Sequence, residues 1–123
     1  MRRRTQRLLP VLAALILLPA AAALALSYGT PNGGAPPLCY INSPGNGATV
    51  PAGRPLTVKA GANSFNGVAR VSFFVDGREV ATDHSRPYEY TFTPGSGSHT
   101  VRAKATGYMG NWKMSNPVTF TAR

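Results

Sequence analysis

The chain has few acidic residues and a single cysteine. Asp and Glu together number four in 123 residues, against thirteen Lys and Arg. With one cysteine, Cys39, an intramolecular disulfide is impossible. The four carboxylates are scattered, and nothing marks the convergent pair that glycoside hydrolysis requires. These scarcities exclude a disulfide-stabilised scaffold and argue against an enzyme that cleaves sugars.

Motifs for other catalytic chemistry are also missing. There is no G-x-S-x-G nucleophile elbow, and the stretch 95–98 (GSGS) is a plain loop. His84, His99 and Cys39 do not have the spacing of zinc ligands. We therefore predict a protein that is not an enzyme and that needs no metal or other cofactor. His99 is expected to be structural, with its ring packed under a corner and bonded to backbone.

The N-terminus has the pattern of a secretory signal. Four arginines lie among residues 2–7, and residues 8–26 follow without a charge. The tripeptide Ala23-Leu24-Ala25 fits the A-x-A cleavage pattern, with Ala25-Leu26-Ser27 as a second option. Residues 1–27 are thus predicted to form a signal peptide helix that directs export to the periplasm, the cell surface or the medium. Because the run is about long enough to cross a bilayer, an uncleaved membrane anchor is the alternative.

The rest of the chain has the pattern of a β-sandwich. Residues 28–37, rich in Gly, Pro and Asn, are predicted to be a linker, and residues 38–123 a single small domain. No helical periodicity occurs there. Period-two alternation recurs in about seven short runs separated by turn residues, which favours a single antiparallel, all-β sandwich. The runs begin near Leu38, Leu56, Val71, Arg78, Tyr88, Val101 and Val118.

The alternation also predicts the core and one turn. Asp76-Gly77 between two strands indicates a two-residue hairpin. Cys39 lies in the apolar run 38–41 and is expected to be a buried thiol that fills core space. The predicted inward side chains are Val58, Val71, Phe73, Val75, Tyr90, Phe92, Val101, Ala103 and Phe120.

Several of these segments resemble the bacterial immunoglobulin-like domains of exported and cell-surface proteins. The similarity begins with the stretch 41–50 (INSPGNGATV) and continues with the strand and hairpin of 71–77 (VSFFVDG). It extends through Pro87-Tyr88 and through 97–105 (GSHTVRAKA) to the stretch 115–120 (SNPVTF). The resemblance implies an immunoglobulin-like fold. It also implies a module that serves as a spacer, an adhesive unit or an accessory domain that contacts carbohydrate.

The charge and one aromatic segment suggest where such a module would bind. Four of the thirteen basic residues lie in the predicted signal, so the exported part has nine basic residues and four acidic ones. This excess of positive charge favours binding to a partner with an anionic surface. Nucleic acid is not expected, because the chain is predicted to be exported and lacks a nucleic-acid motif. Arg102 and Lys104 share one face of a strand, with Arg70 expected beside them, and are secondary contact candidates.

The first contact candidates are Trp112, Tyr108 and Lys113, in what we expect to be a loop over residues 107–114. An exposed Trp and Tyr could stack on a sugar, whereas a Trp folded back would cap the open end of the sandwich.

The leading hypothesis is an exported, non-enzymatic module that acts in adhesion, or in binding protein or glycan, at the cell envelope. The alternative is an accessory carbohydrate-binding domain of an extracellular polysaccharide-degrading system. A third possibility, a membrane-tethered stalk, requires that the signal stay uncleaved. An exposed, coplanar Trp112–Tyr108 pair would favour sugar, and a buried Trp112 would leave only the general module.

Overall fold

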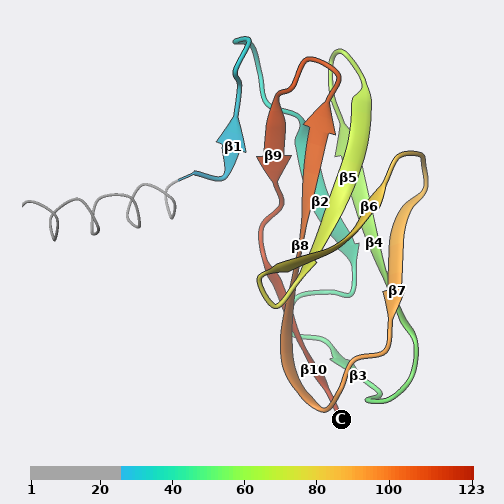
Figure 1. The fold of residues 1–123 in the computed structure, drawn as a ribbon. Helices are drawn as coiled ribbons and strands as arrows, with labels where there is room; N and C mark the ends of the chain where they lie inside the picture. Colours follow the sequence, from blue (N-terminus) through green and yellow to red (C-terminus); the bar gives the residue numbers. More distant parts are fainter. Residues whose placement is uncertain (1–25) are drawn as a thin grey trace, which may run out of the picture.

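The computed structural model describes residues 26–123, and nearly all of the predicted signal peptide, residues 1–25, lies outside the described part. Within 26–123 the chain contains no helix that could cross a membrane. Ten strands account for its regular structure, and they form a sandwich of two sheets (Figure 1). The predicted all-β sandwich is confirmed.

The larger sheet is built around one long strand, β8 (Gly97–Gly107). One edge of β8 pairs with β5 (Val68–Val75), which in turn pairs with β6 (Arg78–Asp83). The other edge of β8 pairs with two strands, one after the other along its length. Its first half pairs with β10 (Val118–Ala122) and its second half with β9 (Trp112–Met114). Two short strands complete this sheet: β1 (Tyr28–Gly29) beside β9, and β3 (Thr49–Val50), parallel to β10.

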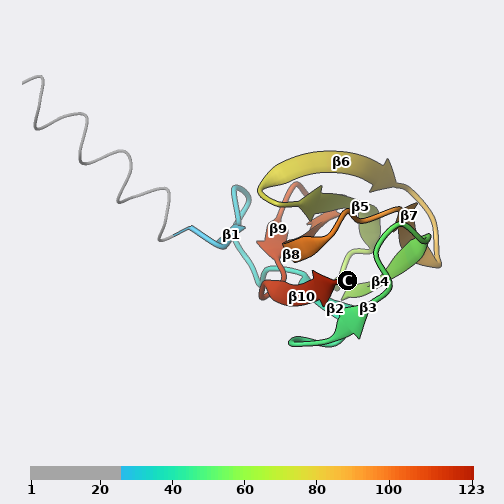
Figure 2. The ribbon, with the colours of Figure 1, turned by 90° about the horizontal axis from the view of Figure 1, so that it is seen from below.

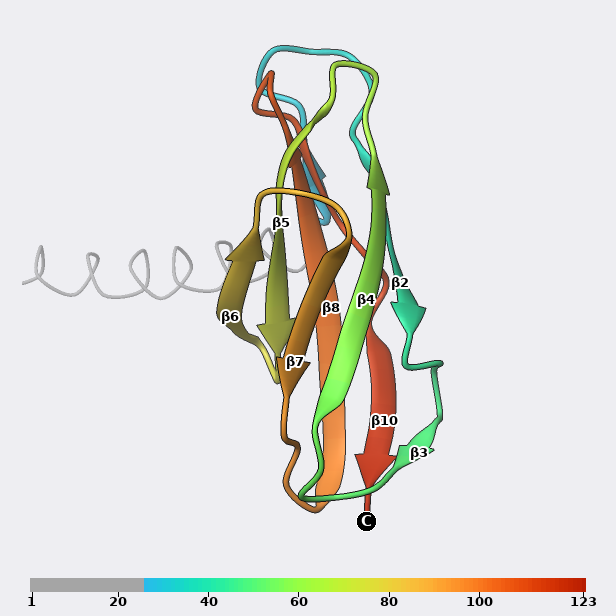
Figure 3. The same cartoon turned by 90° about the vertical axis from the view of Figure 1, so that its right-hand side faces the viewer.

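The smaller sheet has the order β2–β4–β7. Its strands are β2 (Leu38–Ser43), β4 (Leu56–Asn63) and β7 (Tyr88–Phe92), all paired antiparallel. Figure 2 looks along the strands and separates β5 and β6 on one side from β2 and β4 on the other. In Figure 3 the strands β7, β4 and β2 lie side by side.

The core lies between the sheets and consists mainly of the predicted residues. Val58, Val71, Phe73, Val101, Ala103 and Phe120 are buried, and Val75, Tyr90 and Phe92 pack against them as partly buried side chains. Cys39 is buried, as predicted, and Ala60, Ala62, Tyr88 and Ala105 join the core. Alternation along each strand is therefore enough to place most of the apolar side chains on the inner face.

The predicted hairpin is also present. Val75 of β5 pairs with Arg78 of β6, which leaves Asp76 and Gly77 as the two turn residues. Both have positive φ, 51° and 85°, as a tight hairpin turn of this kind requires.

Three short strands, β1, β3 and β9, were not expected from the sequence. The segment 107–114 is not wholly a loop, because residues 112–114 pair with both β8 and β1. A strand of three residues is too short to show alternation, so only its neighbours reveal it. The expected linker, residues 28–37, is tied to the domain through β1 and through Asn111, whose Nδ2 donates to the carbonyl oxygens of Gly33 (2.8 Å) and Ala35 (3.2 Å).

Candidate functional site

Trp112 lies on the outer face of the larger sheet. Its cross-strand partners are Thr106 of β8 and Gly29 of β1. A methyl group added at Gly29 would lie 2.2 Å from Trp112 Nε1, so the indole occupies the space where a side chain of residue 29 would stand. The tryptophan is half-buried. Because it faces away from the core, it does not form the cap that was the alternative to an exposed, stacking Trp.

Two basic side chains share this face with Trp112. Lys104 Nζ lies 4.7 Å from the centroid of the Trp112 ring, in cation–π contact. Arg102 is two residues away on the same strand, and its Nε donates to the carbonyl oxygen of Ser115 at 2.9 Å. Both side chains are half-buried, and so they lie along the sheet. Arg70 of β5 pairs with Thr106 of β8 and lies on the same side of the sheet. We call the surface formed by Trp112, Lys104, Arg102 and Arg70 the basic face.

A groove of about 420 Å³ continues the basic face toward the β5–β6 hairpin. Its wall combines apolar side chains with Arg102. The lining residues are Phe74, Gly77, Thr100, Arg102, Met114 and Pro117. Sequence reasoning missed Phe74. The outward position of Phe74 in the alternation of residues 71–75 was the one signal that could have indicated it.

The other two first candidates lie elsewhere. Lys113 points to the side opposite Trp112, because neighbours in a strand alternate. It lines a hollow with Cys39, and its Nζ is 5.4 Å from the ring centroid of Tyr28. Tyr108 is exposed in the turn between β8 and β9, where its ring lies against Gly67. The structure thus brings Trp112 together with Lys104 and Arg102, but not with Tyr108 or Lys113.

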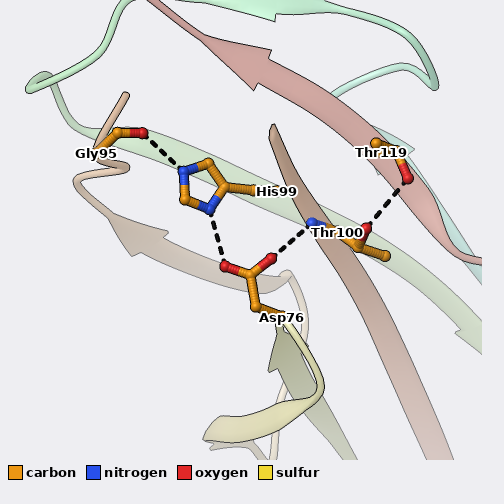
Figure 4. Close-up of polar contacts among 5 residues, drawn as sticks. All are labelled: Asp76, Gly95, His99, Thr100 and Thr119. Atoms are coloured by element: carbon orange, nitrogen blue, oxygen red, sulfur yellow. Dashed lines mark hydrogen bonds and ion pairs between the residues drawn. The ribbon is translucent and has the colours of Figure 1, made fainter. Parts of the chain in front are cut away.

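His99 and Asp76 form a polar corner beside the hairpin (Figure 4). His99 Nδ1 is 2.8 Å from Asp76 Oδ2, and its Nε2 is 2.7 Å from the carbonyl oxygen of Gly95. Asp76 Oδ1 accepts from the Thr100 N–H at 2.9 Å. The ring also packs against Phe120, at 5.6 Å between centroids. The predicted structural role of His99, packed at a corner and bonded to backbone, is confirmed.

The corner shifts the pKa of both groups. The hydrogen bond to Asp76, followed by that to Gly95, raises the pKa of His99. Partial burial acts to raise the pKa of Asp76, but the hydrogen bonds from His99 and from the Thr100 N–H outweigh it and lower that pKa. Both ring nitrogens face oxygen acceptors, an arrangement that suits the imidazolium form. The pair joins the β5–β6 turn to β8. The hydrogen-bond partners of the ring in the described chain are the Asp76 carboxylate and the Gly95 carbonyl, and neither is a hydroxyl or thiol nucleophile.

Within residues 26–123 no three His, Cys, Asp or Glu side chains come together as a metal site would need. Burial raises the pKa of the Cys39 thiol to about 11, which keeps it protonated and poorly nucleophilic at neutral pH. The carboxylate of Asp83 accepts from the backbone N–H groups of Ser85 and Glu89. Asp83 and Cys39 are therefore held by contacts within the domain.

Comparison with known proteins agrees with the observed β-sandwich. A family model described as bacterial Ig domain matches residues 37–103. Domains of this kind are generally non-catalytic and are typically extracellular or exposed on the cell surface. No curated protein matches the chain.

The chain is also similar to several solved structures. The fibronectin(III)-like modules of CbhA from Clostridium thermocellum align with a TM-score of 0.66 and 23% identity, over 69% of this chain and 94% of that chain. This likeness concerns the fold alone. A lytic polysaccharide monooxygenase from Jonesia denitrificans aligns with a TM-score of 0.45 and 16% identity, over 67% of this chain and 60% of its own. Because the family model covers more than half of the residues, the chain belongs to the bacterial Ig domain family.

Proposed function

We propose that this protein is an exported, non-enzymatic adhesion module that binds an anionic polymer of the cell envelope through its basic face. The observation that carries the proposal is that Trp112, Lys104 and Arg102 lie together on one uncovered sheet face. The three come from two strands, and neighbouring contacts hold each of them in place.

The charge of this face supports an anionic partner. Arg70, Arg102 and Lys104 lie on its two central strands, β5 and β8, and Glu79 on β6 is the acid that shares the face. Glu79 Oε2 already accepts from the hydroxyl of Thr82 at 3.2 Å. A surface with an excess of cations raises the local concentration of a polyanion and its rate of association. Sugar phosphates and uronic acids of envelope polymers carry such charge.

Restraint of the side chains supports specific binding over loose attraction. Arg102 is fixed by its bond to Ser115, and Lys104 rests over the indole. Side chains that are already ordered lose less entropy when a ligand binds. Tyr108 and Lys113 lie off this face and are not part of the proposed surface.

The binding test uses the full chain and bacterial cell wall that carries teichoic acid, with the same wall stripped of that polymer as a reference. At about physiological salt, loose attraction is screened. We expect saturable binding that Lys104→Ala and Trp112→Ala each weaken about tenfold. Arg54→Ala is the matched control, because Arg54 is an exposed cation outside this face. Equal losses in all three variants, or equal binding to stripped wall, would refute the proposal.

Export is tested separately by fractionating cells that make the full chain and by measuring the mass of the exported product. Cleavage after Ala25 or after Ser27 leaves β1 complete, since that strand begins at Tyr28. Retention of residues 1–27 in a membrane fraction would support the anchored stalk instead.

A further inference from the structure

The smaller sheet presents a tyrosine ring on its outer face, on the opposite side of the sandwich from the basic face. Tyr40 of β2 is paired with Gly61 of β4. A methyl group added at Gly61 would lie 2.3 Å from Tyr40 Cζ and 2.5 Å from its hydroxyl oxygen. The ring therefore lies across β4, in the space that a side chain of residue 61 would fill. An aromatic ring that covers a glycine in this way is held by the sheet beneath it.

The ring is supported from below but remains open to solvent. Tyr40 is 46% exposed. A structural role as cover for Gly61 accounts for the buried part of the ring and leaves the exposed part free. An aromatic side chain fixed in this way has little conformational entropy left to lose when a ligand stacks on it.

A hollow of about 500 Å³ adjoins the ring, within the usual size range of small-molecule sites. Polar side chains from all three strands line it: Asn42 of β2, Lys59 of β4 and Glu89 of β7. Lys59 and Glu89 are direct cross-strand partners. Arg86 lies at one end, where its Nη2 donates to the carbonyl oxygen of Ala62 at 3.0 Å.

These groups match the chemistry of a neutral sugar. A pyranose ring has a C–H face that stacks on an aromatic ring, and hydroxyls that both donate and accept. Lys59 supplies donors, Glu89 supplies acceptors, and Asn42 supplies both. A purely apolar ligand would leave these polar groups without partners. Glu89 offsets one of the two cations at the hollow, Lys59 and Arg86, so the net charge there is lower than on the basic face and selects a polyanion less strongly.

We infer that Tyr40, Asn42, Lys59 and Glu89 form a binding site for a neutral pyranose oligosaccharide, with Tyr40 as the stacking platform. The site is separate from the basic face and does not rest on the function proposed for it. The protein would then contact two kinds of polymer through its two sheets.

The test measures binding of the full chain to cellohexaose and to chitohexaose by isothermal titration calorimetry. We expect saturable binding to at least one of them. Tyr40→Ala should weaken it about tenfold or more, Glu89→Gln several-fold, and Tyr40→Phe little, because the ring stays. Phe65→Ala is the matched control, since Phe65 is a fully exposed aromatic outside the hollow.

Thermal unfolding of each variant shows whether the sandwich is intact. If Tyr40→Ala loses its fold because Gly61 is uncovered, Glu89→Gln still tests the site without altering the core. Absence of saturable binding to both oligosaccharides, or binding that folded Tyr40→Ala and Glu89→Gln retain in full, would overturn the inference. Trp112→Ala should leave this binding unchanged. The two proposals can therefore fail separately. Loss of cell-wall binding alone would count against the basic face, and absence of oligosaccharide binding alone would count against this site.

Discussion

The imidazole of His99 bridges Asp76 and the backbone of Gly95, with Nδ1 2.8 Å from Asp76 Oδ2 (Figure 4). The two residues belong to different parts of the larger sheet. Asp76 is in the β5–β6 turn, and His99 is near the start of β8. Their contact joins the hairpin to the long central strand at one end of the sandwich.

This contact predicts a pH-dependent stability. The pKa of Asp76 is lowered in the folded protein, so this group stabilises the fold at pH values above 3.8, its ordinary pKa. The pKa of His99 is raised, so this group stabilises the fold at pH values below 6.5, its ordinary pKa. The contribution is therefore complete between these values. It is lost as pH rises through the raised pKa of His99 or falls through the lowered pKa of Asp76.

Asp76→Asn removes the charge and keeps a side chain that tolerates positive φ. The variant should be less stable than the parent by about 0.5–1 kcal/mol at pH 5.5, and by less at pH 8.5. Urea unfolding at the two pH values measures the difference. An equal difference at both would mean that the pair contributes no pH dependence.

A second prediction concerns the close approach of Gly29 to Trp112. Gly29→Ala would place a methyl group against the indole nitrogen, so β1 must move away from β9 or the indole must turn outward. We expect a cost of about 1–3 kcal/mol, smaller if β1 simply detaches. Gly45→Ala is the control, because a methyl group there meets nothing within 4 Å.

A double-mutant cycle separates contact from general damage. In the Trp112→Ala background, Gly29→Ala should cost much less, since the clashing ring is gone. Unfolding free energies of the four proteins give the coupling. Additive costs would show that the indole does not occupy the space beside residue 29.

A third prediction concerns Ser115, whose side chain is almost fully buried. Its Oγ accepts from the Ala103 N–H at 2.9 Å and donates to the carbonyl oxygen of Asn116 at 3.0 Å. Ser115→Ala leaves a buried N–H without a partner and should cost about 1–3 kcal/mol of unfolding free energy. Chemical denaturation measures it, and Ser96→Ala, at an exposed serine, should cost almost nothing. Similar values for the two variants would contradict this role.

A fourth prediction concerns the reactivity of Cys39. Its pKa, raised by burial from 9.0 to about 11, reduces the thiolate fraction at pH 8 by about a hundredfold, and burial also blocks access. A thiol-specific reagent should therefore modify the native protein at least about a hundred times more slowly than the protein unfolded in urea. Comparable rates in the two states would show that the thiol is accessible in the folded protein.

Local patterns in the sequence account for much of the fold. Side chains alternate along a strand with period two, so runs such as 71–75 and 101–105 reveal both a strand and its inner face. The Asp76-Gly77 pair specifies its turn through backbone conformation alone. The burial of Cys39 follows from its apolar neighbours in 38–41. Each of these predictions needs only residues that are adjacent in the chain, and each is confirmed.

The candidate sites depend on pairings that no local pattern contains. Trp112 and Lys113 are adjacent in sequence but lie on opposite sides of β9, a strand recognisable only once β8 and β1 flank it. Tyr40 becomes a platform because the register of β2 on β4 sets it over Gly61, 21 positions further along the chain.

The sequence by itself therefore determined the seven longer strands and most of the side chains that face the core, because both follow from alternation between neighbouring residues. Only the tertiary structure decided which outward side chains meet. The reason is that the register between distant strands is set by packing of the whole core, and a shift of one residue would turn every side chain to the other face.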